Sequence, residues 1–344
     1  MNFASDNTTG AHPKIVAAMV AAADGRAMPY GSDAITKRVE VRLAAIFEHE
    51  CAVFLVGTGT AANALALAAL VPPYGAVLCH PEGHINTDEC GAPEFYTGGA
   101  KLVAIAGTNG KIAAGDIERH VALAGVGSIH HVQPAAVSLT QATEAGTIYR
   151  VDELGAIGAT CRKHGLALHI DGARFANAVV SANRTPADLT WRAGVDVLSL
   201  GATKNGAMAA EAIVFFDKTK AESLGFRRKR AGQLWSKHRF LAAQMEAYLA
   251  DDLWLASARH SNAMAARLAD GLKRVRGASF RDPVEANEIF VRLPETALAG
   301  LERDGFVFYR WPGADPQLIR LVTAYDTQAA DVDAFISSAQ RHAG

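Results

Sequence analysis

The sequence predicts an α/β protein in which a large domain with a mostly parallel sheet is followed by a small α+β domain. Over the first two thirds of the chain, short apolar runs typical of buried strands alternate with segments of helical periodicity. Such alternation is typical of a mainly parallel sheet that helices cover on both faces. After Trp235 the pattern changes to a long helical stretch followed by three strand-like runs, which indicates the second domain.

The helices of the first part can be placed by their caps and their apolar spacing. Ser32-Asp33 can cap a helix whose apolar residues, from Ile35 to Phe47, recur on one helical face. A segment rich in Ala and Leu at 61–70 predicts the next helix, and a helix at 151–164 closes with Gly165 as its C-cap. Short apolar runs predict strands at 51–56, 76–79, 102–105, 136–139, 166–170, 195–200 and 212–216.

The last third of the chain carries the elements of the small domain. A helical stretch at 237–275 is interrupted around Asp251-Asp252. Three strand-like runs follow at 289–293, 306–309 and 319–322, with turn residues between them. Because no flexible linker separates the two parts, we expect a rigid interface between the domains.

Composition and charge argue against several classes of protein. The chain has 344 residues, half of them hydrophobic and 20% charged, and a net charge of −1, so nothing indicates a nucleic-acid or membrane partner. No apolar run reaches the ~18 residues of a transmembrane helix, and the first residues lack the pattern of a signal peptide. The four cysteines are widely spaced and form no zinc pattern. We therefore expect reduced thiols, a cytoplasmic location and no metal site.

Two predicted strands end in ionisable residues. The run 168–174 carries Asp171 at the end of one strand, and the run 198–206 carries Lys204 after a later one. Ligands of open α/β sheets bind at the carboxyl ends of the strands. There an acid can hydrogen-bond a ring nitrogen while an amine forms a Schiff base with an aldehyde, and pyridoxal 5'-phosphate (PLP) requires these two groups. Taken alone, Asp171 could instead cap the next helix and Lys204 could be a solvated loop residue.

The turn Gly57-Thr58-Gly59-Thr60 lies between a predicted strand and a predicted helix. Free backbone N–H groups and threonine hydroxyls at a helix N-terminus suit a phosphate group. The turn is not a dinucleotide fingerprint, because Ala62 stands where the third glycine would be, and it lacks the Walker lysine. The alternative is a tight strand-to-helix turn without a ligand.

His84 follows the predicted strand at 76–79 and so lies at the same edge of the sheet. An imidazole there could stack on a pyridine ring and take a proton from a substrate hydroxyl. A structural role is the alternative, since the chain has 12 histidines. His80 lies four residues earlier, but Pro81 and Gly83 argue against the helix that a metal-binding pair would need.

Two arginines are candidates for binding an anion. Arg174 lies three residues after Asp171, and its guanidinium matches a carboxylate, with a surface salt bridge as the alternative. Arg320 is embedded in an apolar strand, where an arginine needs either an anionic ligand or an internal ion pair. The basic run at 227–230 is typical of a solvated face, although one or two of its members could meet a phosphate of a neighbouring subunit.

Taken together, these motifs resemble the threonine aldolase family, PLP-dependent enzymes of the aspartate-aminotransferase-like fold (fold type I). The resemblance is to the low-specificity L-threonine aldolases, with the phenylserine aldolase branch as a further candidate, and it covers nearly the whole chain. One departure is the segment 231–237, where many relatives have Gly-Gly and then Arg-Gln. In the family's order, the matching motifs are residues 5–13, Tyr30-Gly31-x-Asp33, Thr58-Gly59-Thr60-x-x-Asn63, His84, Asp171-Gly172-Ala173-Arg174 and Thr203-Lys204-Asn205-Gly206.

The resemblance implies a role for each candidate residue. The cofactor would be held by Lys204 as the Schiff-base amine, Asp171 at the pyridinium, Thr58, Gly59 and Thr60 at the phosphate, His84 on the ring, and Arg174, Arg228 and Lys229. The substrate carboxylate would be bound by Ser5, Arg174 and Arg320, with Tyr30 also in the substrate site. A second family histidine matches His130 or His131. Tyr30 and the pair Arg228-Lys229 would reach the neighbouring subunit's site, which implies a homodimer or a homotetramer.

The resemblance also implies a domain division and an activity. We expect an N-terminal segment at 1–14 that reaches the active site, a large PLP-binding domain at 15–236 and a small domain at 237–344. The implied reaction cleaves an L-β-hydroxy-α-amino acid (threonine, allo-threonine or phenylserine) to glycine and an aldehyde. His84, His130 or His131 would accept the hydroxyl proton. The alternative is another lyase of the same fold, a β-eliminating enzyme that would release a keto acid and ammonia.

Overall fold

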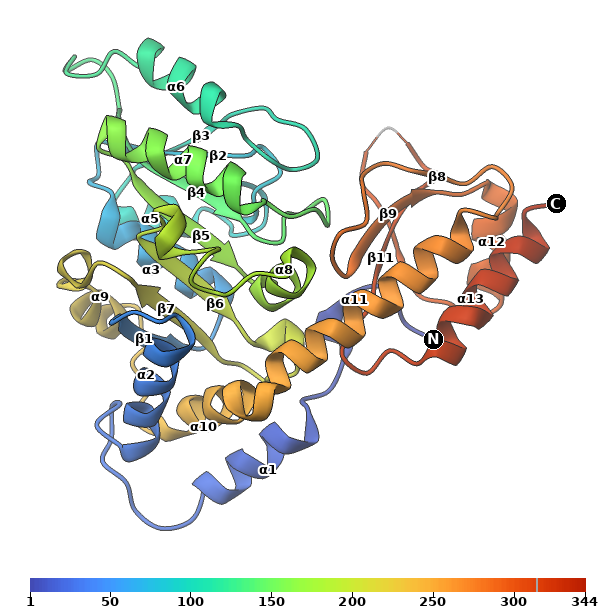
Figure 1. Ribbon diagram of the computed structural model, residues 1–344, viewed down its shortest axis with the longest axis horizontal. Helices are drawn as coiled ribbons and strands as arrows, with labels where there is room; N and C mark the ends of the chain where they lie inside the picture. Colours follow the sequence, from blue (N-terminus) through green and yellow to red (C-terminus); the bar gives the residue numbers. More distant parts are fainter. Residues whose placement is uncertain (314) are drawn as a thin grey trace.

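The computed structural model describes residues 1–313 and 315–344, which form two lobes of unequal size (Figure 1). The strands of the large lobe are β1 (Ala52–Val56), β2 (Gly75–Cys79), β3 (Lys101–Ala104), β4 (Gln133–Thr140), β5 (Ala167–Gly172), β6 (Val197–Gly201) and β7 (Glu211–Phe215). They form one seven-stranded sheet in the order β1-β7-β6-β5-β4-β2-β3. The strands from β3 to β6 are parallel, whereas β7 runs antiparallel to both β6 and β1. The predicted, mostly parallel sheet is confirmed.

Helices cover both faces of this sheet, so its strands are buried on both sides. The helices of the large lobe are α1 (Pro13–Ala22), α2 (Ala34–Ile46), α3 (Gly59–Leu70), α4 (His84–Thr87), α5 (Ala92–Thr97), α6 (Ala114–Leu123), α7 (Val151–His164), α8 (Phe175–Ala182), α9 (Leu224–Arg230) and α10 (Arg239–Leu249). Short 3-10 helices are η1 (Asp6–Thr8), η2 (Trp191–Ala193), η3 (Thr203–Asn205), η4 (Lys218–Ala221) and η5 (Ala250–Asp252).

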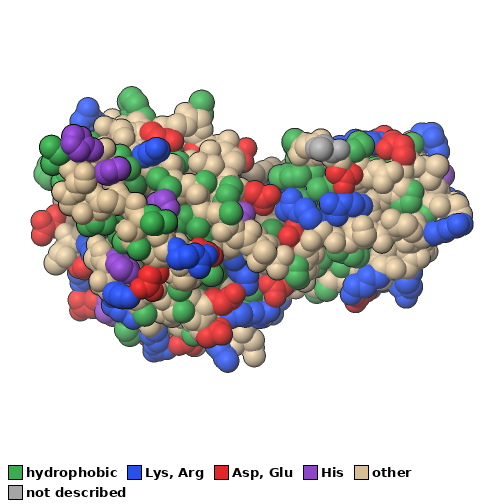
Figure 2. Space-filling model, turned by 90° about the horizontal axis from the view of Figure 1, so that it is seen from above, with side chains coloured by type: hydrophobic (Ala, Val, Ile, Leu, Met, Phe, Trp, Pro, Cys, Tyr) green, Lys and Arg blue, Asp and Glu red, His purple; other side chains and the backbone are tan. Residues whose placement is uncertain are grey.

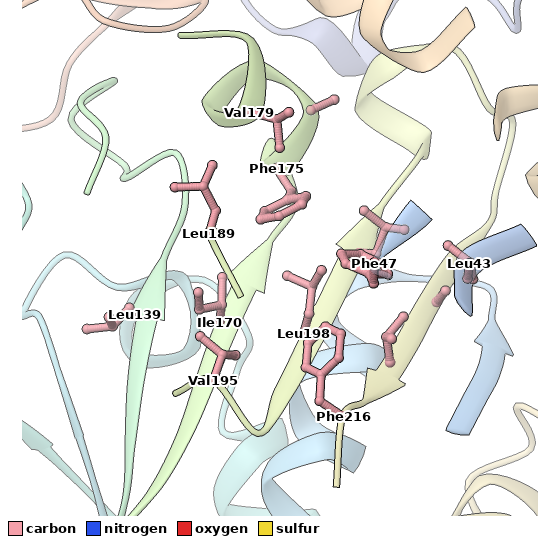
Figure 3. Packing of buried hydrophobic residues seen from close by; sticks show 14 of the residues in the cluster. Leu43, Phe47, Leu139, Ile170, Phe175, Val179, Leu189, Val195, Leu198 and Phe216 are labelled. Carbon is pink, nitrogen blue, oxygen red and sulfur yellow. The ribbon is translucent and has the colours of Figure 1, made fainter. Parts of the chain in front are cut away.

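The alternation of side chains along β6 shows how the two faces are filled. Val197 packs in one apolar cluster with Leu65 of α3. Its neighbour Leu198 points to the opposite face and packs in another cluster with Phe47 and Phe175 (Figure 3). Because successive side chains of a strand alternate between faces, a run of apolar residues is what a doubly covered strand requires.

The small lobe is built on a four-stranded antiparallel sheet with helices on one side (Figure 1). Its elements are α11 (Leu253–Leu272), β8 (Ser279–Phe280), β9 (Glu288–Arg292), α12 (Glu295–Arg303), β10 (Tyr309–Arg310), β11 (Leu318–Val322) and α13 (Ala329–His342). The strand order is β10-β11-β9-β8. The start of the chain joins this lobe, since Asn2 bridges to Val307 and Phe3 lies in the apolar core of the small lobe.

One expected feature of the small lobe is present, and one expected strand is displaced. The interruption at Asp251-Asp252 is present, and both residues have a positive φ, of 49° and 58°. The expected strand at 306–309 is shifted to β10 (Tyr309–Arg310), because Phe306 turns into the core of the small lobe and Val307 pairs with the N-terminal segment instead.

The apolar cores can be compared with the expected boundary at 236/237, which stays a prediction. Met245 of α10 and Ala258 of α11 belong to the core of the large lobe, whereas Ala265 and Leu268 belong to that of the small lobe. The division therefore falls within α11, which runs from one lobe to the other (Figure 1). Helical periodicity shows which face of a helix is apolar but not which core that face covers.

No helix in the described part of the chain combines the length and the apolar character needed to cross a membrane. On the face shown in Figure 2, acidic and basic side chains are interspersed, with apolar ones scattered between them. Neither sign forms a continuous surface on that face.

Phe335 tests the core of the small lobe. Its buried ring lies 5.2 Å from Phe3 and 5.1 Å from Phe306, so removing it leaves a cavity between the N-terminal segment and α13. We expect Phe335→Ala to lower the free energy of unfolding by about 3–5 kcal/mol in urea titrations. Phe95→Ala is the matched control, because Phe95 is 78% exposed and its loss should cost much less. Equal losses in the two variants would contradict this packing.

Candidate active site

A cavity of about 350 Å³ opens at the carboxyl ends of the central strands of the large sheet. Parallel pairing places Thr140 of β4, Asp171 of β5 and Ser199 of β6 side by side at this edge. The segments after β1, β2, β5 and β6, the start of β7 and the N-terminal segment supply the remaining wall. The residues that line the cavity are Asn7, Gly57–Thr60, Ala62, Asn63, His84, Asp171, Ala173, Ser199, Thr203, Lys204, Met208, Ala209 and Glu211.

Asp171 is a nearly dehydrated carboxylate whose hydrogen-bond partners are neutral. It is 5% exposed, and its Oδ2 accepts from Nδ2 of Asn63 at 2.8 Å while its Oδ1 accepts from the N–H of Ala173 at 3.0 Å. A buried carboxylate is costly unless a cation accompanies it. Its position in the cavity wall therefore fits a ligand with a cationic nitrogen.

Lys204 lines the same cavity from η3, directly after β6. Its neighbour Asn205 fixes the turn, because its Nδ2 donates to the hydroxyl of Tyr248 at 2.9 Å and to the carbonyl of Trp254 at 2.8 Å. A short, anchored turn places the amine opposite the strand that carries Asp171. The two residues that the sequence singled out thus lie in one cavity.

The turn before α3 has the shape expected of an anion site. The side chain of Thr58 caps the helix by accepting from the N–H of Ala61, and Gly59 faces open space at the helix N-terminus. The first N–H groups of a helix lack partners within the helix and attract negative charge. Thr60 lies in the same wall of the cavity.

The segment that departs from the family pattern covers this turn. The side chain of Gln233 accepts from the N–H of Gly57 at 3.0 Å. A Cβ atom at Gly57 would lie 2.9 Å from the ring of Trp235, so only glycine fits there. The segment that departs from the family pattern therefore contacts the glycine-rich turn of its own subunit.

His84 stands at the first position of α4, and its ring is held by an acid. Its Nδ1 lies 2.8 Å from Oε1 of Glu89, and its N–H donates to Glu144 at 2.7 Å. The hydrogen bond to Glu89 raises the pKa of His84, although burial opposes this effect. Burial also raises the pKa of Glu144, to about 7.

Arg174 lies beside the cavity but is paired with acids of its own chain. It donates to Asp6 at 2.7 and 3.0 Å and lies 2.8 Å from Glu288. The pKa of Asp6 is low although its burial alone would raise it, because Arg174 and Lys204 favour the charged form. The guanidinium of Arg174 is therefore fully paired with buried carboxylates of its own chain. The alternative considered from the sequence was a salt bridge on the surface, whereas this one is buried.

Arg320 of β11 is less fully engaged. Its Nη2 donates to the carbonyl of Ala4 at 3.1 Å, and its Nη1 lies 3.7 Å from Glu288. Its buried Nε has no hydrogen-bond partner among the described residues. Of the two arginines, Arg320 thus keeps a buried donor without a partner among the described residues, and neither arginine lines the cavity.

Ser5 does not line the cavity, although it was expected to bind substrate. Its hydroxyl caps η1 by accepting from the N–H of Asn7 at 3.1 Å, and Asn7 is the residue of this segment that reaches the cavity. The N-terminal segment is held there partly by the hydrogen bond from His12 to Gly206 at 2.8 Å.

His130 and His131 lie away from the cavity within their own chain. Both are exposed in the loop before β4, at the amino end of that strand, whereas the cavity lies at its carboxyl end. Within one subunit neither histidine reaches the cavity, and the expected role of one of them stays a prediction. The resemblance placed these histidines only by their position along the chain, and that position does not show whether they precede or follow a strand.

Tyr30, Arg228 and Lys229 also lie outside the cavity lining of their own chain. Tyr30 is 47% exposed, with Nζ of Lys229 at 4.7 Å from the centre of its ring. Arg228 points instead toward β1, where it donates to the carbonyl of Leu55 at 3.3 Å. The sequence placed these residues at a neighbouring site, and a single subunit does not test that placement.

Several polar residues of the site had no role in the sequence interpretation. Glu89 and Asn63 are buried next to Asp171, and Glu211 is buried beside Lys204. In the sequence, Asn63 stood out only as the final residue of the motif Thr58-Gly59-Thr60-x-x-Asn63. Glu89 and Glu211 have no local sequence pattern that distinguishes them from other acids. One nitrogen or oxygen atom from each of His84, Glu89 and Asp171 lies within 4.8 Å of the other two.

Comparison with known proteins gives a consistent result. A family model described as beta-eliminating lyase matches residues 2–296. The low specificity L-threonine aldolase of Pseudomonas aeruginosa is 47% identical over 94% of this chain and 93% of that protein, and one from a Pseudomonas species is 45% identical over 96% and 94%. The structure of Leishmania major threonine aldolase has a TM-score of 0.93 at 32% identity, covering 100% of this chain and 99% of the other.

The chain belongs to the beta-eliminating lyase family, among the low specificity L-threonine aldolases. The expected family, the lyase class and the fold type I architecture are thereby confirmed. The residues that carry the resemblance, Asp171 and Lys204 foremost, are also the residues that share the cavity.

Glu211 provides a test of the electrostatics beside Lys204. Its side chain accepts from the N–H of Ala202 at 3.0 Å, and burial raises the pKa of Glu211 to about 7. An acid whose pKa is raised by folding stabilises the fold less as it ionises, so stability should be lost as the pH rises through about 7. Glu211→Gln should remove this loss, worth up to about 3 kcal/mol, in urea titrations between pH 5 and 8.

The matched control is Glu222→Gln, because Glu222 is exposed. Its titrations should follow those of the unmodified protein. If Glu211→Gln also gave the same pH dependence as the unmodified protein, Glu211 would not titrate in this range.

Proposed function

We propose that the chain is a PLP-dependent aldolase that cleaves L-β-hydroxy-α-amino acids to glycine and an aldehyde. Threonine, allo-threonine and phenylserine are the candidate substrates. The observation that carries the proposal is the joint presence of Asp171 and Lys204 in one cavity, with the glycine-rich turn as its third wall. The relatives named low specificity L-threonine aldolase support the same activity.

The cavity residues fit the cofactor group by group. Asp171 would pair with the ring nitrogen, Lys204 would bond to the aldehyde carbon, and Gly59 and Thr60 would bind the phosphate at the N-terminus of α3. When bound, PLP supplies an aldehyde that condenses with amines and a ring that accepts the electron pair released when a bond at Cα breaks. Asp171 contributes by holding the ring nitrogen protonated.

The substrate groups have partners in the same chain. Arg320, with its free Nε, is the better-placed residue for the substrate carboxylate, and Arg174 supports it through the shared Glu288. Ser5 remains near this region through η1. His84 lines the cavity and would accept the proton of the β-hydroxyl group.

The complete site would be formed in a homodimer or a homotetramer. Tyr30 and Lys229 lie together on the surface, outside the cavity of their own chain. The exposed side chains of Met28 and Phe226, on the same segments as these two residues, are 66% and 83% accessible. An apolar surface of this kind next to charged groups suits contact with a second copy.

Lys204→Ala tests the proposed chemistry directly. The purified protein should release glycine and the matching aldehyde from at least one of L-threonine, L-allo-threonine and L-phenylserine. We expect Lys204→Ala to abolish this release and the visible absorbance of bound PLP, because no amine remains to bond the aldehyde. Lys218→Ala is the control, since Lys218 pairs with Glu50 on the surface. Glycine release that survived Lys204→Ala would refute the proposed role.

Product analysis separates the proposal from its nearest alternative. A β-eliminating enzyme of the same fold would give a keto acid and ammonia in place of glycine and an aldehyde. Keto acid and ammonia as the main products would replace the aldolase proposal with that alternative.

A further inference from the structure

The ring of His84 is held in place by one buried acid, Glu89. Oε1 of Glu89 lies 2.8 Å from Nδ1 of His84, and the side chain of Glu89 has no exposed surface. His84 belongs to the cavity wall, whereas Glu89 lies behind it and does not line the cavity. Glu89 can therefore act on a ligand only through side chains of the cavity wall, and His84 is the one whose ring it contacts directly.

Asn63 fixes the position of Glu89 from the other side. Its Nδ2 donates to Oε1 of Glu89 and to Oδ2 of Asp171, both at 2.8 Å. The amide can have only one orientation, because a flipped group would set its oxygen against two carboxylates. A chain of hydrogen bonds thus connects Asp171, Asn63, Glu89 and His84 through the protein interior.

The charged groups around His84 come from several elements. Glu89 and Asp171 favour its protonated form, whereas Lys204 disfavours it. Glu144, after β4, accepts from the backbone N–H of His84 and not from its ring. Among these groups, Glu89 is the one in direct contact with the ring.

We propose that Glu89 is a positioning residue that holds His84 as the tautomer with the proton on Nδ1, so that Nε2 is the atom that accepts a proton from the substrate. This inference rests on the proposed aldolase function and assigns a residue that acts on the base. A carboxylate can only accept, so a neutral His84 in this contact must donate from Nδ1. Its Nε2 then carries the lone pair.

The contact also serves the protonated state. When the β-hydroxyl oxygen loses its proton to Nε2, the imidazole becomes a cation beside the carboxylate of Glu89. The pair then has opposite charges in a buried setting, where such a contact is strong. Glu89 therefore both orients the base and stabilises the charge that the base acquires.

Two substitutions distinguish the role of the negative charge of Glu89 from the role of its hydrogen-bond acceptor. Glu89→Gln keeps an oxygen that can accept from His84 and Asn63 but removes the negative charge. Glu89→Leu removes the acceptor and leaves the ring free to adopt either tautomer. Asp88→Asn is the matched control, because Asp88 is the adjacent acid and is exposed.

The measurements are made on purified protein with PLP bound. Deuterium exchange at Cε1 of His84, followed by mass spectrometry over a range of pH, reports the pKa of this histidine without turnover. We expect Glu89→Gln to lower that pKa by about one unit and to move the acidic limb of the kcat/KM profile by the same amount. We expect Glu89→Leu to lower kcat on the order of 10²-fold, with KM and the absorbance of bound PLP nearly unchanged.

The outcomes are distinguishable. An unchanged exchange profile of His84 in Glu89→Gln, or a loss of bound PLP in Glu89→Leu, would overturn the proposal in favour of a structural role for Glu89. A shift in Asp88→Asn equal to that in Glu89→Gln would also overturn it. If the unmodified protein released no glycine from any candidate substrate, the proposed function would fail, while the exchange profiles would still decide whether Glu89 controls His84.

Discussion

The constraint on which the site depends is the burial of negative charge at the end of the sheet. Five acids beside the cavity or in contact with Arg174 are less than a tenth exposed: Asp6, Glu89, Asp171, Glu211 and Glu288. Buried carboxylates persist only with cations or with several hydrogen bonds. Arg174 and Arg320 serve the acids near the small lobe, but Asp171 has only neutral hydrogen-bond partners. The cationic ring nitrogen of the proposed cofactor would supply what this wall of the cavity lacks.

The sheet explains why residues far apart in the sequence meet there. Parallel strands point their carboxyl ends to one edge, so each loop that follows a strand faces the same space. Asp171 ends β5, Lys204 follows β6, His84 follows β2, and the glycine-rich turn follows β1. The glycine-rich turn faces the same edge although β1 pairs with the antiparallel strand β7. This is because β7 is antiparallel to both β1 and β6, so β1 runs in the same direction as the parallel strands.

Strand ends were predictable from the sequence because an apolar run that stops at an ionisable residue is a local signal. Asp171 and Lys204 could therefore be found before the structure, whereas Glu89 and Glu211 could not, because their partners come from other elements. His130 and His131 illustrate the same limit, since only the fold shows that they precede β4. The apolar face of α10 is a related case, because its periodicity does not show which core the face covers.

The charges near the small lobe bear on the class of substrate. In their usual ionised forms, Arg174 and Arg320 balance Asp6 and Glu288, and all four lie within one connected set of contacts. Burial and the neighbouring Asp6 already raise the pKa of Glu288, so a simple carboxylate on Arg320 would add a further negative charge beside buried acids. An amino acid brings its own ammonium group and is neutral overall, so it adds no net charge when it binds. The balanced cluster therefore favours a zwitterion over a plain acid, which is what the proposed substrates have in common.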